Sequence, residues 1–457
     1  MLPELMAIAL FLSLCLVLLA GYPVAFTLGG LSLLFAGIGV MTGSFDPSFF
    51  GALPSRLFGT MNNQTLLAVP LFVFMGVMLE KSRIADSLLE SMSQLFGGLR
   101  GGLAFSVCLV GALLAASTGI VGATVVTLGL LALPTMLRRG YDPAVATGSL
   151  AATGTLGQII PPSIILVLLG DVLSGAYQQA QLRMGIFAPQ TVTVSDLFIG
   201  ALLPGLLLVG LYLLYLAGVA LLQPHKLPAT PAEQRQPLRL TGLFGSLLPP
   251  LLLIMAVLGS ILGGIATATE AAAVGALGAT LLALCKGQLN LPRLREVVES
   301  TTQISAMVFM ILIGASIFSL VFRGFGGEEM IHQAFNSLPG GVVTATILVM
   351  LAIFLLGFIL DFIEITFVVV PIVGPVLLMM GLDPIWLGVM IALNLQTSFL
   401  TPPFGFSLFY LRGVTPPSVP TSAIYRGVLP FIAIQILMLV IAALWPGLIT
   451  WLPGVLR

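Results

Sequence analysis

The chain has very little charge. Only 7% of its 457 residues are Asp, Glu, Lys or Arg, whereas 58% are hydrophobic. A soluble domain carries about 25% charged residues, so this scarcity excludes an ordinary soluble fold and indicates a membrane protein. Basic and acidic side chains balance to zero net charge, so binding to nucleic acid has no electrostatic basis.

Residues that serve catalysis and metal binding are also scarce. The three cysteines, Cys15, Cys108 and Cys285, are far apart in apolar stretches, which is typical of small core residues rather than of disulfides or metal ligands. The two histidines, His225 and His332, fall in polar segments. The sequence contains no Walker A motif and no enzyme signature. We expect neither catalysis nor an organic cofactor.

Apolar runs near 20 residues, enough to cross a ~30 Å hydrocarbon core, recur along the chain. Glu4 flanks the first run without any Lys or Arg, which favours a membrane helix over a signal peptide. The stretch 84–96 is amphipathic and is expected to lie along the interface. We therefore predict an all-α polytopic membrane protein, with simple helices over residues 3–20, 22–40, 66–81, 197–222, 246–262, 265–286 and 303–322, and a last helix ending near Trp445.

A tandem proline pair occurs twice, at Pro161-Pro162 and at Pro402-Pro403, 241 residues apart. Proline and glycine fix backbone geometry, so a shared spacing indicates a shared shape. We predict two inverted structural repeats, 1–222 and 242–457, joined by a polar linker, 223–241, whose basic excess favours the cytoplasm. The same offset of 241 relates Pro134 to Pro375, Gly140 to Gly381, Asp142 to Asp383 and Pro143 to Pro384.

Each repeat holds a segment too long for one crossing, followed by a helix that a proline pair should break. As one helix, residues 103–137 would be about 52 Å long, and residues 343–380 would be longer still. We expect each to fold into a re-entrant helical hairpin. The prolines should unwind the helices predicted at 143–172 and 384–412, and an amphipathic connector is expected at 174–190.

Non-helical backbone at membrane depth is tolerated only where it is buried in protein or lines a cavity. Freed carbonyls and hydroxyls suit a weakly held alkali cation, and half-helix N-termini favour an anion. Broken helices in two corresponding positions are a sequence indicator of a transporter's binding site. The sequence therefore predicts a site that pairs Na⁺ with a carboxylate.

Asp361 is the most informative single residue, because a charge at the bilayer centre costs about 2.5–3.5 kcal/mol or more. A bound cation, a nearby donor or hydration at an interface would each compensate it. Glu364 is open to the same role, to helix capping or to a surface contact. Glu270 is expected to contact a scaffold or subunit near the membrane surface, and Asp171 and Arg412 to be interfacial, with Arg412 a possible partner of a substrate carboxylate.

Small polar side chains near the breaks have two interpretations. Ser117, Thr118 and Thr155 could line a site, or could bond the preceding turn and pack helices closely. The group Asn394, Gln396 and Thr397 is open to the same two interpretations.

The chain resembles the large membrane subunit of tripartite ATP-independent periplasmic (TRAP) transporters. The matching stretches follow one another in the family's order and span nearly the whole chain: 66–72 (LLAVPLF), 98–103 (GLRGGL), 140–143 (GYDP), 154–164 (GTLGQIIPPSI), 269–275 (TEAAAVG) and 400–405 (LTPPFG). One departure concerns the first hairpin tip, which is often Ser-Gly-Ser in the family and is Ser-Thr-Gly here.

The resemblance implies an elevator-type secondary transporter in the bacterial inner membrane, driven by two or more Na⁺ ions. It would import a small organic acid, either a carboxylate or a 2-oxo acid. A small four-helix membrane subunit and a periplasmic substrate-binding protein would be its partners, and the chain would be an unfused large subunit. The alternative is a stand-alone proton- or Na⁺-coupled anion antiporter of the same fold superfamily.

By position, the resemblance also implies the ligands. The Na⁺ ligands would be Ser117, Thr118, Gly119, Thr153, Thr155, Asp361, Gln396, Thr397 and Thr401. The substrate would be bound by Ser117, Gln158, Asn394 and Thr397.

Overall fold

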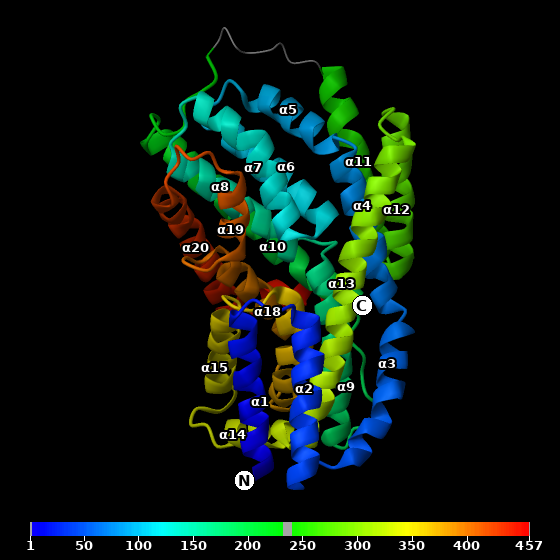
Figure 1. Ribbon diagram of the computed structural model, residues 1–457. Coiled ribbons are helices and arrows are strands. Elements are labelled where there is room, and N and C mark those ends of the chain that lie inside the picture. The colour runs from blue at the N-terminus through cyan, green and yellow to red at the C-terminus, as the bar shows by residue number, and fades with distance from the viewer. Residues whose placement is uncertain (1, 232–239, 457) are drawn as a thin grey trace. The chain divides into compact units, whose positions relative to one another are not determined.

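The computed structural model describes residues 2–231 and 240–456, and at residues 117, 118, 240–243 and 336 it describes the backbone alone. Within this part of the chain every regular element is a helix (Figure 1). Nine of the described helices are long and apolar enough to cross a membrane. The prediction of an all-α polytopic membrane protein is confirmed.

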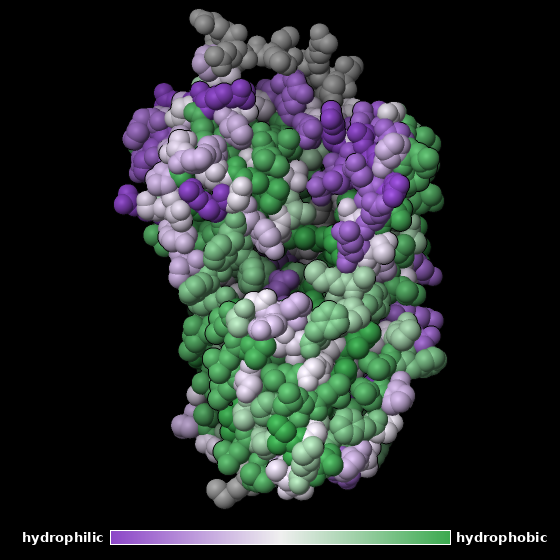
Figure 2. Space-filling model, in the orientation of Figure 1, coloured by the Kyte–Doolittle hydropathy of each residue, from purple (hydrophilic) through white to green (hydrophobic). Residues whose placement is uncertain are grey.

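Large apolar side chains lie on the outside of the described helices. On α1 (Leu2–Leu19), the side chains of Leu5, Leu12 and Leu16 are each more than half exposed. Hydrophobic residues dominate the face shown in Figure 2 over α1 and α2 (Val24–Thr42). Contiguous apolar surface of this kind marks a membrane-contacting face, so lipid covers it.

The chain forms two compact units that interleave along the sequence. Unit 1 comprises the residues up to Leu67, Leu168–Thr193 and Thr302–Gly388, and unit 2 comprises Ala68–Val167, Val194–Thr301 and the residues from Val389 onward. Neither unit coincides with a predicted repeat, and the repeat boundaries themselves stay a prediction. Three helices contribute residues to both units: α9 (Ile164–Arg183), α13 (Leu291–Gly324) and α18 (Pro384–Leu400).

Unit 1 also holds α1, α2 and a set of shorter elements. Its 3-10 helices are η1 (Pro47–Ala52) and η2 (Thr65–Leu67), and η5 (Ile365–Val369) is a π-helix. Its remaining helices are α3 (Leu53–Met61), α14 (Gly327–Asn336), α15 (Gly341–Leu356), α16 (Phe362–Glu364) and α17 (Val370–Met379).

Unit 2 holds the following helices in addition to its parts of the three shared ones. They are α4 (Ala68–Lys81), α5 (Ile84–Phe96), α6 (Gly102–Thr118), α7 (Val121–Arg138), α8 (Pro143–Thr155), η3 (Leu156–Gln158), α10 (Val194–Leu222), α11 (Leu240–Leu262), α12 (Ala268–Cys285), α19 (Phe406–Val414), α20 (Thr421–Leu444) and α21 (Gly447–Leu456).

The segment predicted as a hairpin over 103–137 is two packed helices, α6 and α7. Gly119 makes the turn between them with a φ of +60°, a left-handed conformation that other residues adopt only at a cost. A Cβ at this position would lie 3.0 Å from the backbone nitrogen of Ile164. In unit 1, α15 likewise folds back on α17 after a break at residues 357–361.

Both proline pairs lie in breaks. The helix predicted over 143–172 is α8 and η3, then an irregular stretch that holds Pro161 and Pro162, then α9. The helix predicted over 384–412 is α18, a break that holds Pro402 and Pro403, and α19. The peptide bond within each pair is cis.

Glycine permits the closest helix crossing in unit 2. Helices α8 and α20 meet at Gly148 and Gly427, where a Cβ on Gly148 would lie 2.1 Å from the Gly427 carbonyl oxygen. Only backbone fits between these two helices, so their separation is fixed. The positions of other side chains on α8 and α20 follow from this contact.

The start of the predicted linker packs on unit 2. The Gly101 nitrogen donates to the Leu227 carbonyl (3.0 Å), and the Asp142 nitrogen donates to the Lys226 carbonyl (2.9 Å). Leu227 is fully buried. Residues 226–230 are therefore held against the turns that flank the first hairpin. The prediction for the rest of the linker, 232–239, lies outside the described residues.

Several predicted boundaries are wrong. Helix α13 starts at Leu291 rather than at 303, because its charged first turns are also helical, with an Arg295–Glu299 ion pair of 2.7 Å one turn apart. Helix α9 continues to Arg183, through most of the predicted connector. Three further α-helices, α3, α14 and α21, had no prediction. Helices α3 and α14 are polar for membrane helices, and α21 starts directly after Pro446.

Candidate functional site

The polar residues around the first break are buried inside unit 2. Thr153, Thr155 and Gln158 have no exposed surface. The ends of α6 and η3 lie close together, since a Cβ on Gly157 would be 3.5 Å from the Ala115 carbonyl oxygen. The first hairpin tip and the first helix break therefore meet at one place, as the sequence predicts for a site.

Four buried side chains form a hydrogen-bonded cluster at the first break. The Thr155 hydroxyl accepts from Gln396 Nε2 on α18 and from Gln435 Nε2 on α20, each at 3.3 Å. Gln435 Nε2 also donates to the Tyr212 hydroxyl on α10, at 2.7 Å. All four side chains are at most 2% exposed. Elements from both predicted repeats therefore supply one polar centre within unit 2.

The cluster and its surroundings leave polar atoms without hydrogen-bond partners among the described residues. These are the Oε1 atoms of Gln396 and Gln435, together with both amide atoms of the nearby Gln158. The Thr153 hydroxyl, which lies near the Cys108 thiol, is also buried without a hydrogen-bond partner among the described residues. A buried polar atom left unpaired costs about 1–3 kcal/mol, so several within one cluster call for an explanation. Unpaired hard oxygen atoms are the ligands that a small cation or an ordered water requires.

At the second break Thr397 is buried and Thr401 is partly exposed, and the hydroxyl protons of both are used within their own chain segment. Thr397 Oγ1 donates to the Leu393 carbonyl (2.8 Å) and Thr401 Oγ1 donates to the Thr397 carbonyl (2.7 Å). Thr155 Oγ1 donates in the same way to the Ala152 carbonyl, at 2.8 Å. These threonines bond the preceding turn. The oxygens of Thr397 and Thr401 remain able to accept or to coordinate, whereas Thr155 already accepts from two glutamine amides. Asn394 is 5% exposed.

Asp361 and Glu364 cap a helix in unit 1. Asp361 Oδ1 accepts from the Phe362 nitrogen (2.7 Å), and Glu364 Oε2 accepts from the Asp361 nitrogen (3.1 Å). The capping interpretation of Glu364 is therefore confirmed. A π-helix, η5, follows directly, and π-bulges are frequent at functional sites. Within η5 the Thr366 hydroxyl is fully buried without a partner among the described residues.

The predicted site residues are divided between the two units. Unit 1 contains Asp361. Unit 2 contains Gly119, Thr153, Thr155, Gln158, Gln396, Thr397 and Thr401. The side chains of Ser117 and Thr118 lie outside the described part of the structure; their backbone ends α6. Their roles as ligands stay a prediction.

Three residues weighed from sequence have clear partners. Glu270 closes a capping box with Thr267 at the start of α12, and accepts from the Thr267 nitrogen at 2.8 Å. Asp171 Oδ1 accepts from Asn63 Nδ2 at 2.8 Å. Arg412 Nη1 donates to the Val419 carbonyl at 2.6 Å.

Sequence reasoning missed Gln435 and Tyr212. One signal was available: Gln435 is the single strongly polar side chain between Gly427 and Leu444 in an otherwise apolar helix. A polar group in such a helix faces the protein interior and finds a partner there. Tyr212 gave no comparable signal, since an aromatic residue in a membrane helix is unremarkable.

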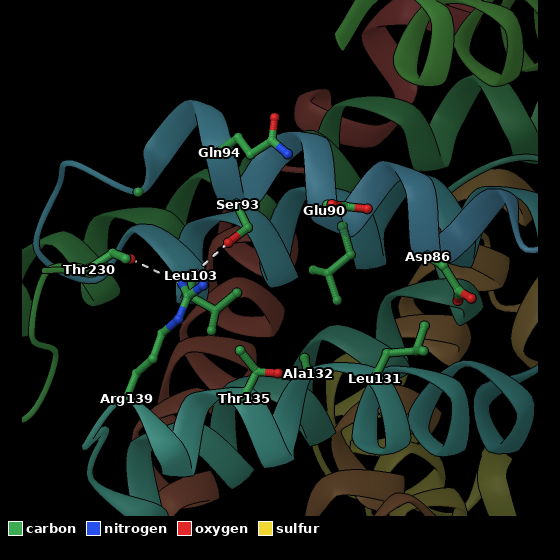
Figure 3. A pocket seen from close by; sticks show the side chains of 12 residues that line it. Asp86, Glu90, Ser93, Gln94, Leu103, Leu131, Ala132, Thr135, Arg139 and Thr230 are labelled. Atoms are coloured by element: carbon green, nitrogen blue, oxygen red, sulfur yellow. Dashed lines mark hydrogen bonds between the residues drawn. The ribbon is translucent and has the colours of Figure 1, made fainter. Parts of the chain in front are cut away.

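A separate cavity of about 460 Å³ in unit 2 is bounded by the polar side of α5 (Figure 3). Arg139, at the end of α7, donates to Ser93 on α5 (3.3 Å) and to Thr230 (3.0 Å) at one end of it. Asp86 and Glu90 line the cavity further along α5. The polar face of α5, expected from sequence to lie at the interface, therefore borders this cavity.

The geometry can be set beside known proteins. Residues 11–448 match the family model described as "Tripartite ATP-independent periplasmic transporter, DctM component". This chain belongs to the TRAP transporter large-subunit family. As a TRAP large subunit it is a multi-pass transporter subunit of the bacterial inner membrane, and the resemblance inferred from sequence is confirmed.

The relatives of this TRAP subunit are named after different compounds. A C4-dicarboxylate TRAP transporter large permease of Pseudomonas aeruginosa is 31% identical over 90% of this chain and 91% of its own length. A sialic acid TRAP permease of Vibrio cholerae is 28% identical over 95% and 96%. An ectoine TRAP permease of Halomonas elongata is 27% identical over 95% and 96%.

Among solved structures, the YdaH transporter of Alcanivorax borkumensis, described as having an unusual topology, matches with a TM-score of 0.63. It covers 97% of this chain and 98% of its own, at 17% identity. The likeness supports the transporter fold of the TRAP subunit.

Proposed function

We propose that this TRAP large subunit imports a small organic acid, a carboxylate or a 2-oxo acid, by Na⁺-coupled elevator transport. A small four-helix membrane subunit would be its partner, and a periplasmic binding protein would deliver the substrate. The names of the relatives support an acidic or zwitterionic cargo. They do not choose among these classes, so the compound is left open.

The observation that carries Na⁺ coupling is the set of unpaired oxygens around Thr155. The Oε1 atoms of Gln396 and Gln435 are buried, neutral and without partners among the described residues. A neutral oxygen cage binds a monovalent cation weakly enough to release it, which a transport cycle needs. Broken helices that expose backbone carbonyls beside such a cage are the arrangement that Na⁺-coupled transporters use.

The test is uptake into proteoliposomes that hold this chain with its small membrane subunit, in the presence of the binding protein. An inward Na⁺ gradient should drive accumulation of a carboxylate, and replacing Na⁺ by K⁺ should stop it. Uptake that is indifferent to the Na⁺ gradient would sink the proposal.

A stand-alone antiporter is the second candidate, and the paired acids Asp361 and Glu364 favour it. Their direct hydrogen-bonded contact through the Asp361 nitrogen places two titratable groups together in an apolar part of unit 1. Transport by the isolated chain under a pH gradient, without either partner, would support this alternative.

A further inference from the structure

Unit 1 contains a cavity of about 370 Å³ that neither the helix breaks nor the Thr155 cluster explains. Helices α3, α9, α13 and α17 and the π-helix η5 surround it. Its polar lining consists of Arg56, Thr60, Asn63, Asp171, Ser316 and Ser319. A cavity of this size falls within the range that small-molecule sites occupy.

The guanidinium of Arg56 has no hydrogen-bond or ion-pair partner among the residues that the structure describes. The carboxylate nearest in its electrostatic surroundings is Glu328. That carboxylate already has three partners: it pairs with Arg183 and Arg323 at 3.0 Å each and accepts from Gln179 at 2.6 Å. Arg56 is therefore a half-buried cation with free donors that face a cavity.

Two serine hydroxyls that line the cavity also lack hydrogen-bond partners among the described residues. Ser316 and Ser319 lie one turn apart on α13, and both line the cavity. Helical serines commonly donate back to the preceding turn, as Thr60 does toward the Arg56 carbonyl at 3.1 Å. Neither Ser316 nor Ser319 makes such a bond with any described residue. Donors from α3 and α13 thus remain available for an anion.

Asp171 gives the cavity one acceptor. Its Oδ1 atom accepts from Asn63 Nδ2, while its other oxygen has no partner among the described residues. Asn63 Oδ1 in turn accepts from the Thr65 nitrogen at 2.9 Å, and the second N–H of its amide has no partner among the described residues. The lining therefore combines a free cation and two hydroxyls with a single free carboxylate oxygen.

We propose that this cavity binds a small carboxylate that also carries a hydroxyl or an amino group. Arg56 takes the carboxylate, because a guanidinium forks onto both carboxylate oxygens, and Ser316 and Ser319 supply further donors. Asp171 accepts from the hydroxyl or ammonium of the ligand and repels a second carboxylate. This inference rests on the proposed function for its ligand class, and it adds a selection for hydroxy and amino acids.

The test places a reporter cysteine in the cavity. Gly59 lines the cavity, and a Cβ there meets no atom within 4 Å, so Gly59→Cys should fold in a variant whose three native cysteines are serine. The full chain in neutral detergent is labelled with an anionic sulfonate thiosulfonate and with a cationic trimethylammonium one. The ratio of anionic to cationic rates should fall about tenfold in Arg56→Gln. It should not change in the control Arg295→Gln, whose side chain is exposed outside the cavity.

Protection by ligands identifies the chemistry. Gluconate, glycerate and β-alanine are tested against sorbitol, which lacks a carboxylate, and hexanoate, which lacks the second group. At least one of the first three should slow labelling, and Arg56→Gln should remove the effect. In Asp171→Asn, hexanoate should protect as well as the best of them.

Three results would overturn the proposal. The first is a ratio of labelling rates that is the same in Arg56→Gln as in the parent. The second is that none of the three acids slows labelling. The third is that only phosphatidylglycerol slows labelling in an Arg56-dependent way, which would make the cavity a lipid headgroup site. The assay uses neither partners nor an ion gradient. Failure of Na⁺-driven uptake therefore counts against the proposed function alone, and failure of labelling counts against the cavity alone.

Discussion

Gln396 Nε2 donates a hydrogen bond to the Thr155 hydroxyl across 241 residues of sequence, at 3.3 Å. That separation equals the spacing of the two proline pairs, so the bonded residues occupy corresponding positions in the two predicted repeats. In the predicted repeats, equivalent side chains that meet each other would lie close to the axis that relates the two copies. The prediction therefore puts the candidate cation site where the two copies would meet.

The first prediction concerns Gln396→Leu, which removes one unpaired oxygen and one donor to Thr155. The Na⁺ concentration for half-maximal uptake should rise about tenfold, since one lost ligand or hydrogen bond is worth about 1–3 kcal/mol. Uptake in proteoliposomes across a Na⁺ series measures this. An unchanged Na⁺ dependence with a lowered maximal rate would instead indicate a structural role.

The second prediction distinguishes a residue that stabilises the Thr155 cluster, Tyr212, from a candidate Na⁺ ligand, Gln435. Tyr212→Phe removes only the hydroxyl that accepts from Gln435 at 2.7 Å. The unfolding free energy should fall by about 1–3 kcal/mol, because a buried amide N–H loses its acceptor, while the Na⁺ dependence of uptake should shift less than in Gln435→Leu. Thermal unfolding in detergent and uptake are compared for both variants. Equal Na⁺ shifts would contradict the distinction.

The third prediction concerns Gly148→Ala on α8. The new methyl carbon would lie 2.1 Å from a backbone oxygen of α20, and backbone does not yield as a flexible side chain does. The unfolding free energy should fall by about 1–3 kcal/mol and uptake should fall with it. The matched control is Gly175→Ala in α9, where no atom lies within 4 Å and a gain of about 0.5–1 kcal/mol is expected. Thermal unfolding of Gly148→Ala and Gly175→Ala measures whether the unfolding free energy falls in the first variant and rises in the second.

The fourth prediction concerns Glu328→Gln in unit 1. This change leaves Arg183 and Arg323 without the carboxylate that both contact at 3.0 Å. The two guanidinium groups are more than a third exposed, so water compensates part of the loss, and a decrease of about 1–2 kcal/mol in unfolding free energy is expected. The same measurement on Glu299→Gln, whose pair with Arg295 is exposed, should show almost no change.

The membrane class, the hairpins and the breaks could be predicted from sequence, because apolar length and proline act locally. Pro161 and Pro402 impose their effect wherever the chain places them. The Thr155 cluster could be predicted only in part. Thr155 and Gln396 stand beside the prolines, but Gln435 reaches them from α20 through a packing that no local pattern encodes.

The misplaced elements have physical reasons as well. The first turns of α13 carry Arg293, Arg295 and Glu299, which hydropathy assigns to a loop although such residues are good helix formers. In the same way, the cavity around Arg56 was not foreseen, because its lining comes from four separate stretches of unit 1. Sequence periodicity reports one element at a time and cannot bring such stretches together.

The interleaving of the two units has a consequence for biogenesis. Unit 1 needs residues up to Gly388, and unit 2 needs the residues that follow Val389. When a ribosome has delivered the first half of the chain to the membrane, neither unit is complete. Thr155 and Tyr212 then lack their hydrogen-bond partners Gln396 and Gln435, which have not yet been synthesised. Truncation before Gln435 should therefore leave the Thr155 cluster unassembled, and expose the truncated chains to quality-control proteolysis.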